Sequence, residues 1–371
     1  MSVDTPFGFV SRRSTLAAWI AILATLPACS DGVTGPGAQA FDARAAAEAA
    51  RSALPDQEEN SDLYTNLELV SAELSGASPA AAVASGLPQV TALFRGEGTT
   101  QVVSPAALSL LAEAAEEDPD GRDVSLSLLL PESLVGSTLV WDPESERYVV
   151  SETRDDAPED GVRFVMYAVN PATRKPALPL NELGYVDLID ESTDDSSLRL
   201  RVRAVDTSGD EPVTLLDYVI GGEVVLSGET RLSAEAEGFV SDGTDRLDFV
   251  LTQEIVLSSD TDTATGTTSY ALSVPDSEVA LDLDMEGVFD LADGEPTSFD
   301  LGLTVTDGTS EIVLDAAVDA EQAMDGTVSF DGETVVVIGG TVEEPTFTRP
   351  DGSELSEEEK EAFRELVEAV Q

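Results

Sequence analysis

Cysteine, whose thiolate is the strongest nucleophile among common side chains, occurs once in this chain of 371 residues, as Cys29. The small residue Ala28 precedes it directly, and the apolar run LAAWIAILATL occupies 16–26, behind two arginines. Basic residues, an apolar run of this length and a small residue before a cleavage point are typical of a secretory signal, and the run is too short to span a bilayer. We therefore expect residues 1–28 to be a signal peptide.

Four consecutive residues resemble the lipobox of prokaryotic lipoproteins: Leu26, Pro27, Ala28 and Cys29. The resemblance implies that the Cys29 thiol receives a diacylglyceryl group and that Cys29 becomes the mature N-terminus. Ser30 follows it, whereas an aspartate there resembles an inner-membrane retention signal, so the outer membrane is favoured where the organism has one. An ordinary secretory signal is the alternative, and SRRSTL at 11–16, which resembles the twin-arginine motif, leaves the export route open.

The chain is strongly acidic, with 73 Asp and Glu against 19 Lys and Arg and a formal net charge of −54. Nucleic-acid binding needs clustered basic side chains, so we expect no nucleic-acid partner. Anionic lipid surfaces repel such a body too, so attachment to a membrane must come through the lipid at Cys29. We expect a cell-envelope protein with a lipid or protein partner. Its acidity fits three explanations: a highly solvated surface, adaptation to salt, or the collection of cations.

Histidine is absent from the chain. Ser-His-Asp and Cys-His hydrolases and His-ligated zinc, copper and haem sites therefore cannot be built within it. An acylated Cys29 leaves no thiolate chemistry. Paired carboxylates for glycoside hydrolysis stay possible, but the sequence does not show which acids lie close together. We expect a protein that is not an enzyme.

Three arginines alternate with apolar residues in the stretch LRLRVRA: Arg199, Arg201 and Arg203. On a β-strand this spacing places three guanidinium groups on one face, where they could bind an anionic ligand or headgroup. The alternative is pairing with acidic side chains on neighbouring strands, which needs no ligand, and we favour it.

Two acidic loops are candidate calcium sites, one with Asp118, Asp120 and Asp123 and the other with Asp260 and Asp262. Both place carboxylates beside a glycine turn. Neither continues to the glutamate at position 12 that an EF-hand loop requires. We therefore expect solvated loops and no cofactor, with Ca²⁺ as the weak alternative.

The elements that would position these groups fall into two regions. We expect 29–39 to be a lipid-anchored tether and 40–123 to be helical, with helices at 41–54, at 62–74 and after Ser104. From about 124 the pattern changes to the alternation of strands. In ALDLDMEG, for example, Leu281, Leu283 and Met285 alternate with acidic residues.

Asp-Gly pairs favour tight hairpin turns, and they recur between these runs at Asp160-Gly161, Asp242-Gly243, Asp293-Gly294, Asp307-Gly308, Asp325-Gly326 and Asp331-Gly332. TVSFDGETVVV predicts one complete hairpin. We expect about ten to fourteen strands in a long antiparallel β-meander, curled into a half-barrel or folded into a sandwich. The fold class is mainly β with α, in which 124–371 ends in an amphipathic helix that begins at Ser356.

The leading hypothesis is a membrane-anchored exported lipoprotein with a non-catalytic binding or scaffolding role. The alternative is a carrier that holds lipid or another apolar ligand in a curled β-sheet cavity. Helices combined with a long curled meander resemble in outline the half-barrels of periplasmic lipoprotein carriers, which is a likeness of fold alone. An enzyme that uses two carboxylates is the third possibility.

Overall fold

The computed structural model describes one helix and most of the chain after it. The described ranges are 61–74, 130–193, 197–225, 230–241, 243–244, 246–258, 263–275, 279–290, 296–306, 308–342 and 344–355. The predicted signal peptide, the lipobox and the tether lie outside these ranges, as do the predicted helices at 41–54 and after Ser104. No helix in the described part is long and apolar enough to cross a membrane.

In the described ranges the elements are one α-helix, α3 (Ser61–Leu74), and β-strands of different lengths that follow each other along the chain. The first strands are β1 (Ser137–Asp142), β2 (Arg147–Val150), β3 (Gly161–Tyr167), β4 (Val169–Asn170), β5 (Lys175–Pro176), β6 (Glu182–Asp190), β7 (Ser197–Asp206) and β8 (Val213–Val225). The others are β9 (Thr230–Ser241), β10 (Arg246–Ser258), β11 (Thr263–Val274), β12 (Val279–Asp290), β13 (Pro296–Thr306), β14 (Glu311–Val318), β15 (Met324–Phe330), β16 (Glu333–Gly340) and β17 (Pro345–Thr348).

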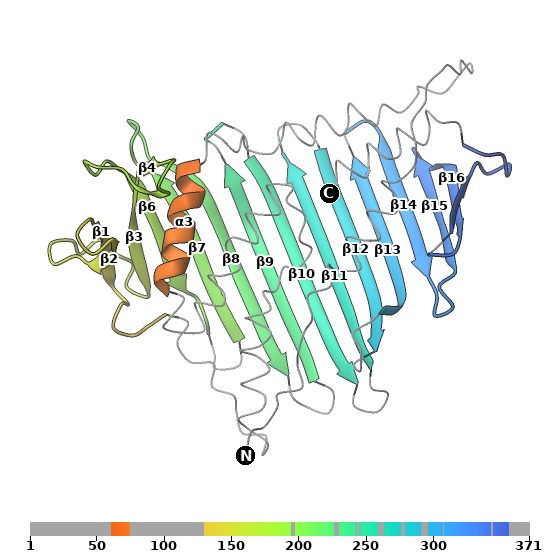
Figure 1. Ribbon diagram of the computed structural model, residues 1–371, viewed down its shortest axis with the longest axis horizontal. Helices are drawn as coiled ribbons and strands as arrows, with labels where there is room; N and C mark the ends of the chain where they lie inside the picture. Colours follow the sequence, from red (N-terminus) through yellow and green to blue (C-terminus); the bar gives the residue numbers. More distant parts are fainter. Residues whose placement is uncertain are drawn as a thin grey trace.

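Fifteen strands form one sheet in the order β17 to β6 and then β3, β1 and β2, while β4 and β5 pair separately (Figure 1). All neighbours from β6 to β17 are antiparallel, and β1 runs parallel to β3. The sheet stays open, because its two edges are β2 and β17, strands of four residues each. Short edge strands offer few unpaired backbone groups to other chains.

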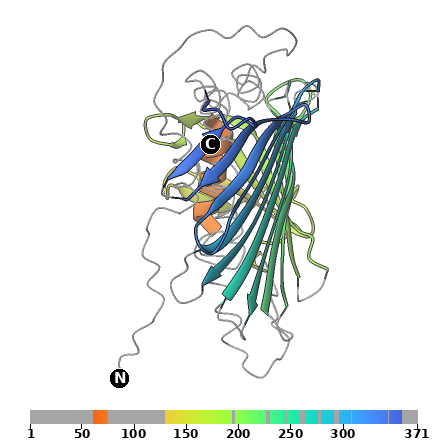
Figure 2. The same cartoon turned by 90° about the vertical axis from the view of Figure 1, so that its right-hand side faces the viewer.

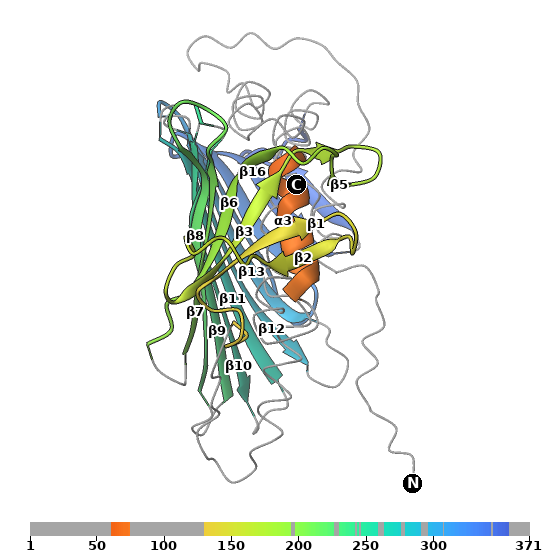
Figure 3. The same ribbon diagram turned by 90° about the vertical axis from the view of Figure 1, so that its left-hand side faces the viewer.

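The sheet is curled, and α3 lies on its concave side (Figures 2 and 3). Leu63, Leu67 and Val70 of the helix join the apolar side chains of β1–β3 in one buried cluster. Tyr148 packs edge-on against both Trp141 and Phe164, with ring centroids 5.5 and 5.2 Å apart. The helix thus covers one end of the concave face.

Polar side chains of α3 fix its position by completing backbone hydrogen bonds of the strand region. The Asn66 amide donates to the Tyr167 carbonyl at 2.9 Å and accepts from the Tyr167 amide at 3.1 Å. The Asp62 carboxylate accepts from the Val169 amide at 3.0 Å. Buried backbone groups need such partners, so these contacts join the helix to β3 across about a hundred residues of sequence.

The structure confirms the mainly β fold and two local predictions. The predicted helix at 62–74 is α3, and TVSFDGETVVV is the β15–β16 hairpin, whose turn residues Asp331 and Gly332 have φ of 48° and 78°. Positive φ at both positions is the requirement of the tight turn that favours Asp-Gly.

Other predictions about the sheet need correction. The main sheet has fifteen strands rather than ten to fourteen, and the parallel β1–β3 pair makes it mixed. Asp325-Gly326 is no turn, because it lies inside β15, where a Cβ on Gly326 would lie 2.5 Å from the Asp315 carbonyl oxygen. The predicted C-terminal helix is not confirmed, because 356–371 lie outside the described residues.

Candidate ligand-binding site

The concave side of β8–β14 forms a continuous uncharged surface, which we call the inner face. The paired residues Leu251, Tyr270, Leu283, Leu303 and Leu314 form one row of it, running across β10–β14. Every second residue of each strand faces this side. Among these inward residues of β8–β14, from Leu216 to Val318, there is no Asp, Glu, Lys or Arg.

Along β12 the inner face is partly exposed. A first buried cluster extends from α3 to Tyr270 and Val274 on β11, and a second joins β13–β16 with Leu355. Between the two clusters, Leu281, Leu283 and Met285 of β12 are only partly buried, and Leu283 packs against both clusters. The inner face therefore has a partly exposed apolar strip along β12, formed by Leu281, Leu283 and Met285, between the two buried clusters.

Three buried polar atoms on the inner face have no hydrogen-bond partner among the described residues: the hydroxyls of Tyr218 and Tyr270 and the amide oxygen of Gln253. Burial raises the pKa of both tyrosines above the ordinary value. Most buried polar side chains have a partner, so an unpaired one needs a physical explanation. Sequence reasoning missed these residues, although each is a polar residue at an inward position of an otherwise apolar strand.

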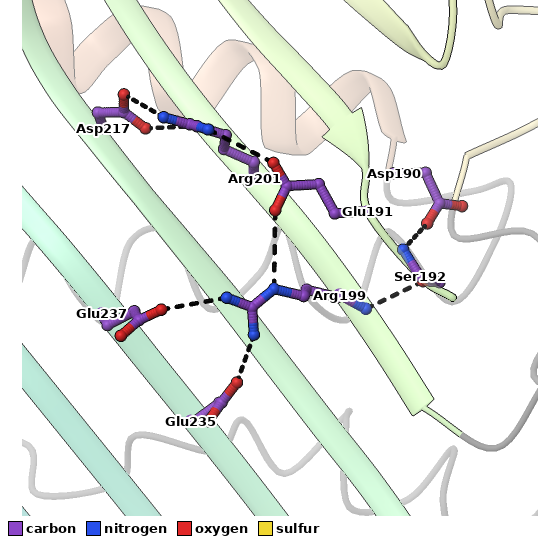
Figure 4. A network of polar contacts seen from close by, with 8 residues as sticks. All are labelled: Asp190, Glu191, Ser192, Arg199, Arg201, Asp217, Glu235 and Glu237. Carbon is purple, nitrogen blue, oxygen red and sulfur yellow. Dashed lines mark hydrogen bonds and ion pairs between the residues drawn. The ribbon is translucent and has the colours of Figure 1, made fainter. Parts of the chain in front are cut away.

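The opposite, outer face carries the predicted arginine row, and the structure pairs two of the three arginines across strands (Figure 4). Arg199 bonds Glu235 at 2.7 Å and Glu237 at 3.1 Å. Arg201 makes a bidentate pair with Asp217 at 2.7 and 2.8 Å, and that hydrogen bonding is the main reason why its pKa is raised. Arg199 and Arg201 are therefore paired with acidic side chains of other strands, the alternative that needs no ligand.

Glu191 connects these two pairs, because it lies 3.6 Å from the Arg199 Nε and 3.5 Å from the Arg201 Nη1. Arg203 is exposed, and no residue of the described ranges bonds it. Its two register partners, Asp187 and Asp217, pair with other arginines, Arg163 and Arg201 respectively. The row therefore presents one unpaired guanidinium rather than an anion site of three.

The outer face of β11–β15 is acidic. A shallow hollow of about 560 Å³ over β11–β15 contains Asp284, Glu286, Asp300, Asp315 and Asp325 in its lining. Within the described ranges, no three metal-ligating side chains come close enough to hold a metal ion. The predicted calcium loops, with Asp118, Asp120, Asp123, Asp260 and Asp262, lie outside these ranges.

Comparisons of this chain with protein-family models, with curated proteins and with solved structures found no match.

Proposed function

We propose that this protein is a membrane-anchored carrier that holds lipid or a similar apolar ligand on the inner face of its curled sheet. The uncharged inner face, partly exposed along β12, supports the carrier alternative over a scaffolding role. β11 and β12 have 12 residues each, which corresponds to about 40 Å at ~3.3 Å per residue. A bilayer core of about 30 Å contains two layers of acyl chains, so one extended acyl chain fits along such a strand.

The two faces of the sheet suit different roles in such a carrier. Apolar ligands gain free energy in proportion to the apolar area removed from water, and only the inner face offers such an area without charges. The outer face, with its exposed carboxylates, is repelled by anionic lipid surfaces. In this proposal the acyl chains on Cys29 keep the protein at the membrane, and the inner face takes up the ligand.

Lipid that copurifies with the protein tests the carrier. The full chain is expressed in a bacterial host, purified, and analysed for bound lipid by native mass spectrometry. Leu283→Gln places an amide on the inner face, and we expect about tenfold less lipid per protein, equivalent to about 1.4 kcal/mol. Asp282→Gln changes the adjacent, exposed residue of the same strand and should leave the lipid content unchanged. A wild type without lipid, or equal lipid in both variants, overturns the carrier.

The anchor has its own test, because it depends on a residue far from the inner face. Cells that express the full chain are grown with radioactive fatty acid, and the protein is isolated. The wild type should be labelled and Cys29→Ala should not. An unlabelled wild type would contradict the anchor and leave the carrier proposal standing for a protein free of the membrane.

A further inference from the structure

The inner face is apolar except for a few polar side chains, and two of these lie on adjacent strands beside the partly exposed strip of β12. Gln253 on β10 pairs with Thr268 on β11, and Tyr270 on β11 pairs with Leu251 on β10. Gln253 and Tyr270 are therefore diagonal neighbours across one antiparallel pair, with Cα atoms about 7–8 Å apart. On its other side Tyr270 pairs with Leu283, the residue at the centre of the strip.

Both side chains have unused hydrogen-bonding capacity. The Tyr270 residue is 7% exposed, and neither its hydroxyl nor the Gln253 amide oxygen has a partner among the described residues. A tyrosine hydroxyl can donate to a carbonyl oxygen, whereas an amide oxygen can only accept and so requires a donor. A ligand that satisfies both atoms must carry both an acceptor and a donor.

The charge of the surroundings limits that ligand further. No inward residue of β8–β14 between Leu216 and Val318 is charged, so a phosphate or a carboxylate would be buried there without a counter-ion. Burying an unpaired charge costs far more than burying a hydroxyl or an ester. An anionic headgroup is therefore a poor fit, and a neutral polar group is a good one.

We propose that the ligand is a neutral acylglycerol, a lipid with ester carbonyls and a free hydroxyl, whose glycerol end contacts Gln253 and Tyr270. Its acyl chains extend along the apolar strip of β12, over Leu281, Leu283 and Met285. This inference rests on the proposed function, because it names the ligand of the same inner face. Tyr218 on β8 serves as an internal comparison, since its hydroxyl also has no partner among the described residues while its ring packs against Phe249.

The test measures equilibrium binding of four radiolabelled probes to the delipidated full chain: dioleoylglycerol, its acetylated derivative without the hydroxyl, oleate and squalene. Dioleoylglycerol should bind about tenfold more tightly than the acetylated derivative, the effect of one lost hydrogen bond to a buried partner. Oleate should bind more weakly than either. Squalene should bind through the apolar strip alone.

Variants separate the two polar contacts from the apolar strip. Tyr270→Phe and Gln253→Leu should each weaken dioleoylglycerol binding about tenfold and leave squalene binding unchanged. Tyr218→Phe should change neither, and thermal unfolding of all three variants shows whether they fold. If squalene binds while dioleoylglycerol shows no dependence on its hydroxyl, Tyr270 or Gln253, or if oleate binds most tightly, the acylglycerol inference fails and the carrier stands. If no probe binds, both fail.

Discussion

Two regions of one sheet bury the same kind of alternating pattern to different degrees: the strands β3, β6 and β7, which share a buried cluster with α3, and the strands around β12. Phe164, Val186, Leu188 and Leu200 are completely buried in the first region. In the second, Leu281 and Met285 occupy equivalent inward positions and are only partly buried. Alternation therefore determines which side chains face inward, and the segments that pack against that face determine how well they are covered.

The outer sides of the two regions differ in how well their charged side chains are paired. In the first region, Arg163 and Asp187 form a bidentate pair at 2.7 and 2.9 Å, and the Arg163 Cζ also lies 3.6 Å from the centroid of the Tyr185 ring. Around β12, Asp282 and Glu286 are exposed, and no described cation bonds them. The first region is therefore built for stability, and the second leaves both its faces accessible to other molecules.

The largest expected effect comes from truncating one apolar residue in each region. Phe164→Ala removes a completely buried ring that contacts Tyr148, and we expect a loss of about 4 kcal/mol in the free energy of unfolding. Leu283→Ala, at a partly buried position, should cost about 1 kcal/mol. Urea unfolding followed by circular dichroism measures both losses. Equal losses would mean that the contrast in burial between the two regions does not carry over to stability.

The next effect compares two ion pairs on the outer side. Asp187→Ala leaves the guanidinium of Arg163, whose side chain is 15% exposed, with only the exposed Asp156 at 3.1 Å as a partner, and we expect a loss of about 3 kcal/mol. Glu237→Ala should cost less than about 1 kcal/mol, because Arg199 is more exposed and keeps Glu235 as a partner. The same unfolding experiment decides, and a costlier Glu237→Ala would contradict the comparison.

Sequence reasoning located strands and turns where the signal is local. Alternation placed Leu281, Leu283 and Met285 on one side of β12, and Asp331-Gly332 predicted a real hairpin. Asp325-Gly326 failed because the same dipeptide also fits inside a strand where another backbone approaches closely. A dipeptide signal does not tell these two situations apart.

Contacts between distant segments were beyond such reasoning. The hydrogen bonds of Asn66 to Tyr167 depend on how α3 docks, and the Arg163–Asp187 pair depends on the register of β3 against β6. Neither leaves a periodic trace in the sequence. Gln253 and Tyr270 did leave one, as polar residues within apolar inward rows, but only the sheet register shows that they are neighbours.

The smallest effect concerns two buried tyrosines that differ in the hydrogen bonding of their hydroxyls. The Tyr148 hydroxyl donates to the Val165 carbonyl at 2.9 Å and lies 3.5 Å from the Asn66 amide oxygen, whereas the Tyr218 hydroxyl has no partner in the described part of the chain. Tyr148→Phe should therefore lose about 1 kcal/mol at pH 7, and Tyr218→Phe should gain up to about 1 kcal/mol. Urea midpoints at pH 7 measure both, and a loss in Tyr218→Phe would show that its hydroxyl is satisfied.

Alkaline pH provides a second measurement on the same pair. Burial raises the pKa of both hydroxyls, so the folded protein keeps them neutral while the unfolded chain ionises them near pH 10. Their contribution to stability is therefore complete below about pH 10 and is lost as the pH rises further, by at most ~1.4 kcal/mol per pH unit for each group. Tyr148→Phe and Tyr218→Phe should reduce this alkaline loss of stability by the same amount, because the loss depends on the burial of the hydroxyl. Their different stabilities at pH 7 depend instead on the hydrogen bond.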